Sequence, residues 1–377
     1  MRITPLFKEF FSSESAGGLM LILATATALI LANSSWNSTY LNVLHWPVGG
    51  KPFEFWVNDG LMTLFFLLVG LEIERELYVG ELSNRRAAML PISAAVGGMA
   101  VPVLIFVAFT YGSPGLSGFG IPMATDIAFA LGILALLGSR VPYGLKVFLT
   151  AVAIIDDMGA VLIISIFYAQ GFSLLFLGCA AATFLAMLLL NRLKVWVLWP
   201  YFLLAIGLWV CLYQAGVHPT ITGILLAFAI PFGTGDEASP SYGLQHRLHL
   251  PVAFLIMPIF ALTNAGLTFS ASDLDTVGSG LSLGIFLGLL VGKPLGVLLF
   301  SWLAIRTSLA NLPDGVRMTH LLGGGILAGI GFTMSIFVTV LAFEDPVMIK
   351  TAKMAILAAS AAAAVSGALL LLRVKKA

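Results

Sequence analysis

Apolar residues fill this chain in long runs that short polar stretches separate. A helix of about 20 apolar residues crosses the roughly 30 Å hydrocarbon core of a bilayer. Runs of this length lie near 16–33, 58–78, 89–110, 116–138, 147–169, 172–191, 196–213, 216–233, 250–269, 281–303, 320–342 and 352–373. The pattern predicts an all-α polytopic membrane protein with about twelve transmembrane helices, in which residues 1–377 form a single transmembrane domain.

Two segments interrupt the apolar pattern with residues that favour turns. Segment 43–56, VLHWPVGGKPFEFW, has apolar residues on both sides of Gly49 and Gly50, which predicts a short β-hairpin outside the membrane. Segment 234–249, TGDEASPSYGLQHRLH, is polar and rich in turn residues, so we expect an irregular loop there.

Glycine and proline break up two of the expected helices. The run at 116–138 is rich in glycine and contains Pro122. Because proline lacks a backbone N–H and disfavours helix at the preceding residue, we expect an unwound stretch near 122–125, just before Asp126. The run at 320–342 contains five glycines. One broken span in each half of the chain predicts an inverted-repeat transporter with its binding site at the membrane midplane.

The composition fits a membrane protein, with 59% hydrophobic and 10% charged residues; soluble domains carry about 25% charged residues. A net charge of +1 gives no reason to expect a nucleic-acid partner. Cys179 and Cys211 both lie in apolar runs, so we expect no disulfide between them. The chain shows no metal-type spacing of Cys or His, and we expect no resident cofactor.

Lysine and arginine indicate the orientation. With the N-terminus in the cytoplasm, fifteen of the 19 basic residues fall on the cytoplasmic side, three on the opposite side, and Lys293 within a span. The positive-inside rule therefore predicts that both termini are cytoplasmic.

Two adjacent aspartates, Asp156 and Asp157, occupy the middle of the apolar stretch 146–169. A carboxylate at that depth costs roughly 2.5–3.5 kcal/mol, so ionisable residues there generally serve a function. Neighbours on a helix point about 100° apart. We therefore expect one aspartate to face an ion cavity and the other to face a neighbouring helix.

Asp126 and Lys293 also lie in the middle of predicted spans. Broken helices leave partial charges inside the membrane, which an aspartate and a lysine can compensate, and this structural role is the alternative to a role in transport. The hydroxyl of Thr125 offers a further oxygen, although it can instead bond its own backbone. Carboxylates suit hard cations such as Na⁺ or Li⁺ but must first lose a proton, so cation and proton compete for one site.

Five long stretches resemble the NhaA family of sodium/proton antiporters: NDGLMTLFFLLVGLEIEREL (58–77), ATDIAFALGIL (124–134), AVAIIDDMGAV (151–161), GVHPTITGILLAFAIP (216–231) and GKPLGVLLF (292–300). The resemblance covers nearly the whole chain. It implies that the broken fourth and eleventh helices cross. It also implies electrogenic, pH-regulated export of Na⁺ or Li⁺ in exchange for protons by alternating access. It further implies a location in the bacterial inner membrane and a homodimer that the outer hairpin helps to form.

The resemblance also assigns roles to individual residues. It identifies Asp157 as the ligand of the metal ion Na⁺ and Asp156 as the ion-site carboxylate that pairs with Lys293. Asp126 and Thr125 match the ion-binding pair in the unwound chain. No position carries an enzymatic role in this family.

A cytoplasmic cluster is expected to sense pH, again by resemblance. Its matching positions are Glu9, Glu72, Arg75, Glu76, His246 and His249. The chain departs from the family pattern at Gln245, where a glutamate is expected; because an amide does not titrate, the pH dependence is expected to differ. Histidine is the side chain whose ordinary pKa suits such a switch, with an ordinary loop role as the alternative. For His218 we expect a packed, hydrogen-bonded role.

Three other functions fit the sequence less well than antiport. An intramembrane aspartyl protease needs two carboxylates that share a proton, but Asp156 and Asp157 diverge on one helix and Lys293 would be unexplained. A sodium-coupled symporter of organic anions needs a larger cavity and does not need both aspartates with a buried lysine. A passive cation channel fits poorly with a site that binds so strongly.

Overall fold

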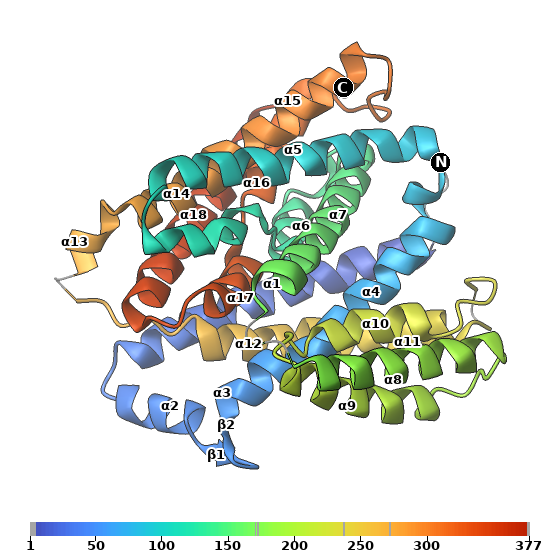
Figure 1. The fold of residues 1–377 in the computed structure, drawn as a ribbon. Helices are drawn as coiled ribbons and strands as arrows, with labels where there is room; N and C mark the ends of the chain where they lie inside the picture. The colour runs from blue at the N-terminus through green and yellow to red at the C-terminus, as the bar shows by residue number, and fades with distance from the viewer. Residues whose placement is uncertain (1–4, 170, 172, 237, 271–272, 375–377) are drawn as a thin grey trace. The chain divides into compact units, whose positions relative to one another are not determined.

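The computed structural model describes residues 5–169, 171, 173–236, 238–270 and 273–374, and most of them are helical (Figure 1). The chain divides into two compact units. Unit 1 comprises Met1–Leu41, Asn84–Ala160 and Ala261–Ala377, and unit 2 comprises Asn42–Ser83 and Val161–Phe260. Both units are therefore assembled from segments far apart in the sequence.

Unit 1 contains the two helices that glycine and proline interrupt. Its elements are α1 (Pro5–Ala32), α5 (Arg85–Thr110), the 3₁₀ helix η3 (Pro114–Met123), α6 (Ile127–Leu136), η4 (Gly138–Arg140), most of α7 (Tyr143–Phe167), α13 (Leu274–Val277), α14 (Gly280–Leu287), the π-helix η7 (Gly288–Gly292), α15 (Lys293–Arg306), α16 (Met318–Ala328), α17 (Phe332–Ala342) and α18 (Pro346–Arg373).

Unit 2 contains the hairpin and the remaining helices. Its elements are β1 (Pro47–Val48), β2 (Lys51–Pro52), α3 (Phe53–Phe55), the π-helix η1 (Trp56–Leu61), α4 (Met62–Tyr78), η2 (Glu81–Ser83), α8 (Leu174–Arg192), α9 (Trp199–Gln214), α10 (Ile221–Ala229), α11 (Pro240–Pro251) and the π-helix η5 (Val252–Ile256). The helices α2 (Asn37–Leu44) and α12 (Met257–Asn264) run from one unit into the other.

Close helix packing in each unit depends on small residues. In unit 1, α5 runs against α15, and a Cβ at Gly296 would collide with the backbone oxygen of Gly97. In unit 2, α4 runs against α10, and a Cβ at Gly223 would collide with the backbone of Thr63 and Leu67. Larger residues at these glycines would push the helices apart.

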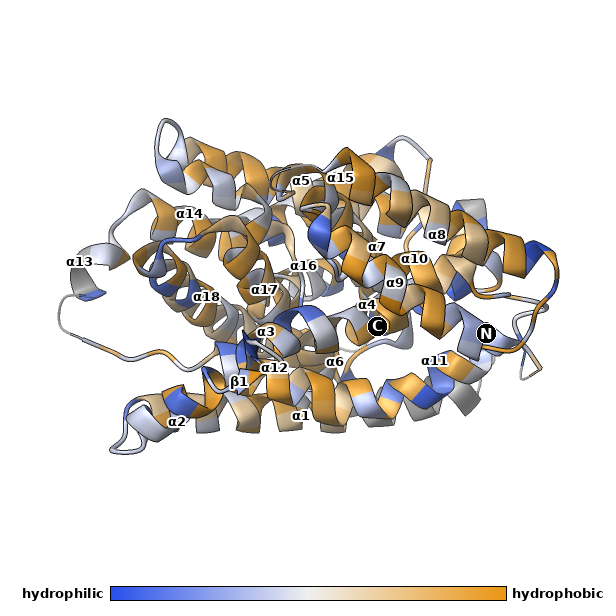
Figure 2. Cartoon of the chain, turned by 60° about the horizontal axis from the view of Figure 1, so that its bottom comes forward, coloured by the Kyte–Doolittle hydropathy of each residue, from blue (hydrophilic) through white to orange (hydrophobic). Residues whose placement is uncertain are grey.

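The prediction of an all-α membrane protein is confirmed. Figure 2 shows long helices that are orange, and so hydrophobic, along most of their length, with blue concentrated at ends and in loops. Among the described residues, seven helices are long and apolar enough to cross a membrane, or up to ten if each bent pair of helices counts as one span. The other two predicted spans are α9, with 16 residues, and α10, with 9. Pro219 and Pro231 bracket α10, which explains why it is shorter than its apolar run.

The hairpin within 43–56 is confirmed. Pro47 pairs with Pro52 and Val48 with Lys51 in an antiparallel ladder. The two turn residues, Gly49 and Gly50, have φ angles of 59° and 83°, which glycine adopts without a steric penalty.

The irregular loop expected at 234–249 is wrong from Pro240 onward, where α11 begins. The Ser239 hydroxyl accepts a hydrogen bond from the Tyr242 N–H at 3.4 Å, and Pro240 stands at the first helical position. A serine followed by proline is a helix start signal, but the polar character of the segment concealed it.

Both predicted helix breaks are present. The axes of η3 and α6 meet at 41°, and those of α16 and α17 at 44°. The first break lies at Ala124–Asp126, slightly later than expected, because the 3₁₀ helix accommodates Pro122. The second break lies between Ala328 and Phe332. The Asp126 N–H donates to the Ile330 carbonyl at 2.7 Å, so the two breaks are in direct contact.

Candidate ion-binding site

A buried ion pair lies beside the first break. Asp156, on α7, and Lys293, the first residue of α15, are both fully buried, and their Oδ2 and Nζ atoms are 2.7 Å apart. The Thr125 hydroxyl lies 2.9 Å from the same Oδ2 atom. The other carboxylate oxygen of Asp156 is buried and accepts no hydrogen bond from the described part of the chain. The pair thus leaves an oxygen that a proton or a cation can use.

Asp157 lies next to this pair on α7 and is only 1% exposed. The two aspartates leave the helix in directions about 100° apart, so they do not act as one chelate. Among the described residues no group of three or more His, Cys, Asp or Glu side chains converges as a resident metal centre would require. Two adjacent carboxyl groups are nevertheless both withdrawn from water.

Asp126 connects the two breaks through its carboxylate. One oxygen accepts the Phe129 N–H at 3.0 Å and thereby caps α6. The other accepts both the N–H of Thr333, at 3.1 Å, and the Thr333 hydroxyl in the first turn of α17. Each helix N-terminus carries about half a positive charge, so one carboxylate balances two helix ends.

Lys293 lies at the C-terminal end of η3, whose partial negative charge its ammonium group can balance. Besides Asp156, its ammonium group donates to the carbonyl of Met123, where η3 ends. The Thr125 hydroxyl lies 3.0 Å from the Ala328 carbonyl, where α16 ends. Asp126 and Lys293 thus each lie at helix ends of the opposite partial charge.

Sequence reasoning missed the partners that α17 supplies. Thr333 is fully buried against Asp126, and the buried Ser335 hydroxyl donates to the Ile121 carbonyl at 2.8 Å. Two hydroxyl residues directly after the glycine-rich break were a usable signal, because hydroxyls often satisfy backbone groups that a break leaves free.

The residues expected to sense pH lie partly together in unit 2. Arg75 and Glu76 form an ion pair at 3.2 Å on α4. Glu72, on the same helix, is buried and hydrogen-bonds to the side chain of Gln245 on α11. His249 is half-buried on α11, whereas His246 is exposed. The side chain of Glu9 lies outside the described residues.

A second polar contact in unit 2 involves His218. Its Nε2 lies 3.3 Å from Asp59, and its Nδ1 lies 2.9 Å from the Thr220 hydroxyl. His218 is therefore packed and hydrogen-bonded, as expected. Asp59 lies on the π-helix η1, and such wide turns often occur at functional positions.

Glu74 is a buried carboxyl that the sequence did not single out. It lies on α4, is 5% exposed, and its Oε2 accepts no hydrogen bond from the described residues. One turn earlier Gly70 packs against Ala227, and one turn later the ring of Tyr78 packs on Phe232 at 5.0 Å. Glu74 therefore lies on an apolar face of α4.

We expect Glu74→Leu to raise the melting temperature of the detergent-solubilised protein by a few degrees. A buried polar group without a partner costs about 1–3 kcal/mol, which leucine removes. Differential scanning fluorimetry measures the change. Glu76→Leu, which breaks an ion pair instead, is the control and should give no increase. A lower melting temperature for Glu74→Leu would show that this carboxyl contributes favourably.

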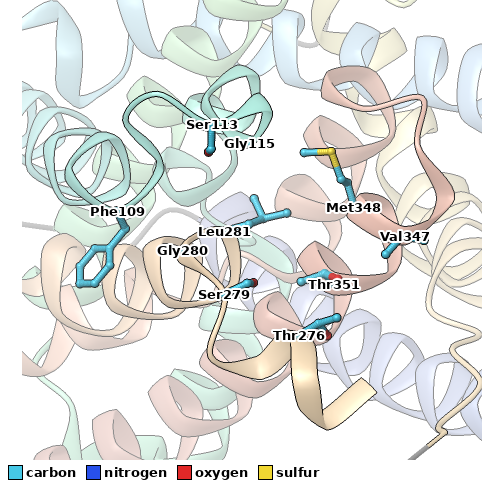
Figure 3. A pocket seen from close by; sticks show the side chains of 10 residues that line it. All are labelled: Phe109, Ser113, Gly115, Thr276, Ser279, Gly280, Leu281, Val347, Met348 and Thr351. Atoms are coloured by element: carbon cyan, nitrogen blue, oxygen red, sulfur yellow. The ribbon is translucent and has the colours of Figure 1, made fainter. Parts of the chain in front are cut away.

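A pocket of about 350 Å³ lies elsewhere in unit 1 (Figure 3). It opens between the end of α5 and the starts of η3, α14 and α18, and its lining includes Phe109, Leu281 and Thr351 but no acidic or basic side chain. Nearby, the hydrogen bond from Lys350 to Asp273, at 2.7 Å, holds the pKa of Asp273 below its usual value. The buried residues Asp126, Asp156 and Asp157 are not among those that line this pocket.

Comparisons with a protein-family model and with known proteins all point to the same family. The model of the family described as Na⁺/H⁺ antiporter 1 matches residues 8–371. The chain is 52% identical to the Na⁺/H⁺ antiporter NhaA of Flavobacterium psychrophilum over 367 residues, covering 97% of this chain and 96% of that one. It is also 52% identical to the Na⁺/H⁺ antiporter NhaA of Cytophaga hutchinsonii over 369 residues, covering 98% and 95%.

Proposed function

The chain belongs to the Na⁺/H⁺ antiporter 1 family, and on this basis we propose that it exchanges Na⁺ for protons across the membrane that its helices span. One observation carries the proposal: a buried carboxylate, Asp156, faces an ammonium and a hydroxyl at the point where two broken helices meet. A closed, oxygen-rich site at such breaks suits a small hard cation.

The buried charges account for competition between the ion and protons. Three carboxyl groups, Asp126, Asp156 and Asp157, are buried with one ammonium group, Lys293. The helix ends at Asp126 add about one positive charge. The C-terminal ends of η3, at Met123, and of α16, at Ala328, add about one negative charge. With every carboxyl ionised, the site therefore carries excess negative charge, which either Na⁺ or protons neutralise.

The roles of the site residues are part of the proposal. Asp157, Asp156 and Asp126 form the ion site, and Thr125 contributes its hydroxyl oxygen. Lys293 and Asp126 hold the charges of the broken helices in balance, and Asp156 also couples the site to protons through Lys293. Exchange proceeds by alternating access and is electrogenic, with more protons moving in than Na⁺ ions out.

The cellular setting is proposed on the same basis. The protein lies in the bacterial inner membrane with both termini cytoplasmic, and the two units act as one inverted-repeat antiporter domain. It forms a homodimer through the outer hairpin, accepts Li⁺ as well as Na⁺, and needs neither a resident cofactor nor a nucleic-acid partner. It catalyses no covalent chemistry.

The test is ion-driven pH change in proteoliposomes that hold an imposed pH gradient. Na⁺ and Li⁺ should each collapse the gradient, and K⁺ should leave it intact. A response to K⁺ equal to that for Na⁺, or no response between pH 6.5 and 9, would contradict the proposed exchange.

We expect Gln245→Glu to move the pH profile of exchange towards higher pH by about one unit. The substitution adds a titrating group beside Glu72, and like charges in one cluster hold protons to higher pH. Exchange rates measured across the pH range test this, with Gln245→Leu as the control because leucine does not titrate. An identical profile for Gln245→Glu and the unmodified chain would show that position 245 does not set the pH response.

A further inference from the structure

The Thr125 hydroxyl has two acceptors for a single hydrogen. Its oxygen lies 2.9 Å from Oδ2 of Asp156 and 3.0 Å from the carbonyl oxygen of Ala328. A hydroxyl carries one hydrogen, so it cannot fully satisfy both acceptors at once. One of the two acceptor oxygens therefore receives a weaker hydrogen bond or none.

Asp156 is the acceptor that the hydrogen favours. Its Oδ2 also lies 2.7 Å from the ammonium of Lys293, which identifies it as the charged member of an ion pair. Hydrogen bonds to charged acceptors are about twice as strong as those between neutral groups. The Thr125 hydrogen therefore goes to Asp156, and the Ala328 carbonyl is left without it.

No backbone donor in the described residues replaces that hydrogen, because α16 ends at Ala328. The N–H groups of Gly329 and Ile330 turn back to carbonyls earlier in α16. The N–H of Thr333 donates to Asp126 instead. The Ala328 carbonyl is thus a C-terminal helix carbonyl that accepts no backbone hydrogen bond from the described residues.

A bare carbonyl at this place needs a positive partner. Ala328 is fully buried, and a buried acceptor without a donor is unfavourable. The carbonyl also lies at the C-terminal end of α16, where the helix carries partial negative charge. The first fact calls for a partner of some kind, and the second favours a cation over a neutral donor.

We propose that the main-chain carbonyl oxygen of Ala328 is a ligand of the transported Na⁺, together with the Thr125 hydroxyl oxygen. Hard cations take oxygen ligands at about 2.3–2.6 Å, so one ion can touch two oxygens that are 3.0 Å apart. The second broken helix thereby enters the coordination shell directly. This inference rests on the proposed exchange of Na⁺ for protons.

The test replaces single amides of the full-length chain by esters, through suppression with α-hydroxy acids. An ester between Ala328 and Gly329 weakens the Ala328 carbonyl as a ligand and removes the Gly329 N–H. An ester between Gly329 and Ile330 removes one N–H from the same break, that of Ile330, which donates to Leu327 at 3.0 Å, but leaves the Ala328 carbonyl an amide. The second ester is therefore the matched control.

Two measurements are made on each protein: the Na⁺ concentration that half-saturates exchange, and the rise in melting temperature that Na⁺ produces in detergent. The first ester should raise the half-saturating concentration about tenfold, equivalent to about 1.4 kcal/mol, and the control less than about twofold. Equal effects from both esters, or no effect from the first, would overturn the assignment.

An unaltered backbone provides a second measurement, in case the ester at 328 prevents folding. Alanine labelled with ¹³C and ¹⁸O at its carbonyl, introduced at position 328 alone, gives an isolated infrared band that should shift when Na⁺ is added. A band that stays in place while Na⁺ stabilises the protein would overturn the ligand assignment alone. Absence of both exchange and Na⁺ stabilisation in the unmodified chain would overturn the proposed function as well.

Discussion

Asp157→Asn is expected to abolish Na⁺-driven proton exchange while the protein stays folded in the membrane. The substitution keeps the shape of the side chain but removes a charge that is 1% exposed. Two unit charges 4 Å apart interact by about 4 kcal/mol at an effective dielectric constant of 20, which corresponds to about a thousandfold loss of Na⁺ affinity. An amide also has no carboxyl proton to exchange for the ion.

The measurement is proton release on addition of Na⁺, both from purified protein and in proteoliposomes. Asp314→Asn, at an exposed loop position, is the matched control and should leave exchange unchanged. Size-exclusion profiles of the two variants confirm folding. Normal Na⁺-driven proton release from Asp157→Asn would refute the assignment of Asp157 as the ion ligand.

Lys293→Ala is expected to lower stability as well as transport. The change leaves Asp156 fully buried without its cation and leaves the Met123 carbonyl without its donor. Breaking a buried ion pair from one side costs about 3–5 kcal/mol, so the melting temperature should fall by about 10 °C.

Thermal melts in detergent test this directly. Lys350→Ala breaks an ion pair whose lysine side chain is 30% exposed, and it should cost no more than about 1 kcal/mol. Adding Asp156→Asn to Lys293→Ala should restore part of the lost stability, because the buried charge is gone, without restoring transport. A melting temperature unchanged by Lys293→Ala would argue against a structural role for the lysine.

The features that could be predicted from sequence are those with local causes. Gly49 and Gly50 suit a tight turn, and the hairpin forms there. Proline or glycine marks two of the three bent helix pairs in the described part of the chain, η3 with α6 and α16 with α17, whereas the bend between α1 and α2 was not predicted. Buried carboxylates stand out because a charge in an apolar run is costly wherever the chain folds.

The features that could not be predicted depend on distant contacts. Thr333 meets Asp126 across 207 positions of sequence, and nothing near either residue specifies the other. The π-helix before Lys293 also left no local signal, because its glycine-containing sequence equally suits an α-helix. For α11, a polar segment concealed a helix whose start signal is two residues long.

The double cap at Asp126 has a mechanical consequence. If α6 and α17 moved apart, the carboxylate would lose its hydrogen bond to the N–H of either Phe129 or Thr333. The helix that lost the bond would then lack its N-terminal cap. Either the two helix ends move together and Asp126 keeps both hydrogen bonds, or they separate and one of the bonds breaks. Because arrangements with one bond broken are unfavourable, α6 and α17 should adopt a few discrete relative positions rather than a continuous range.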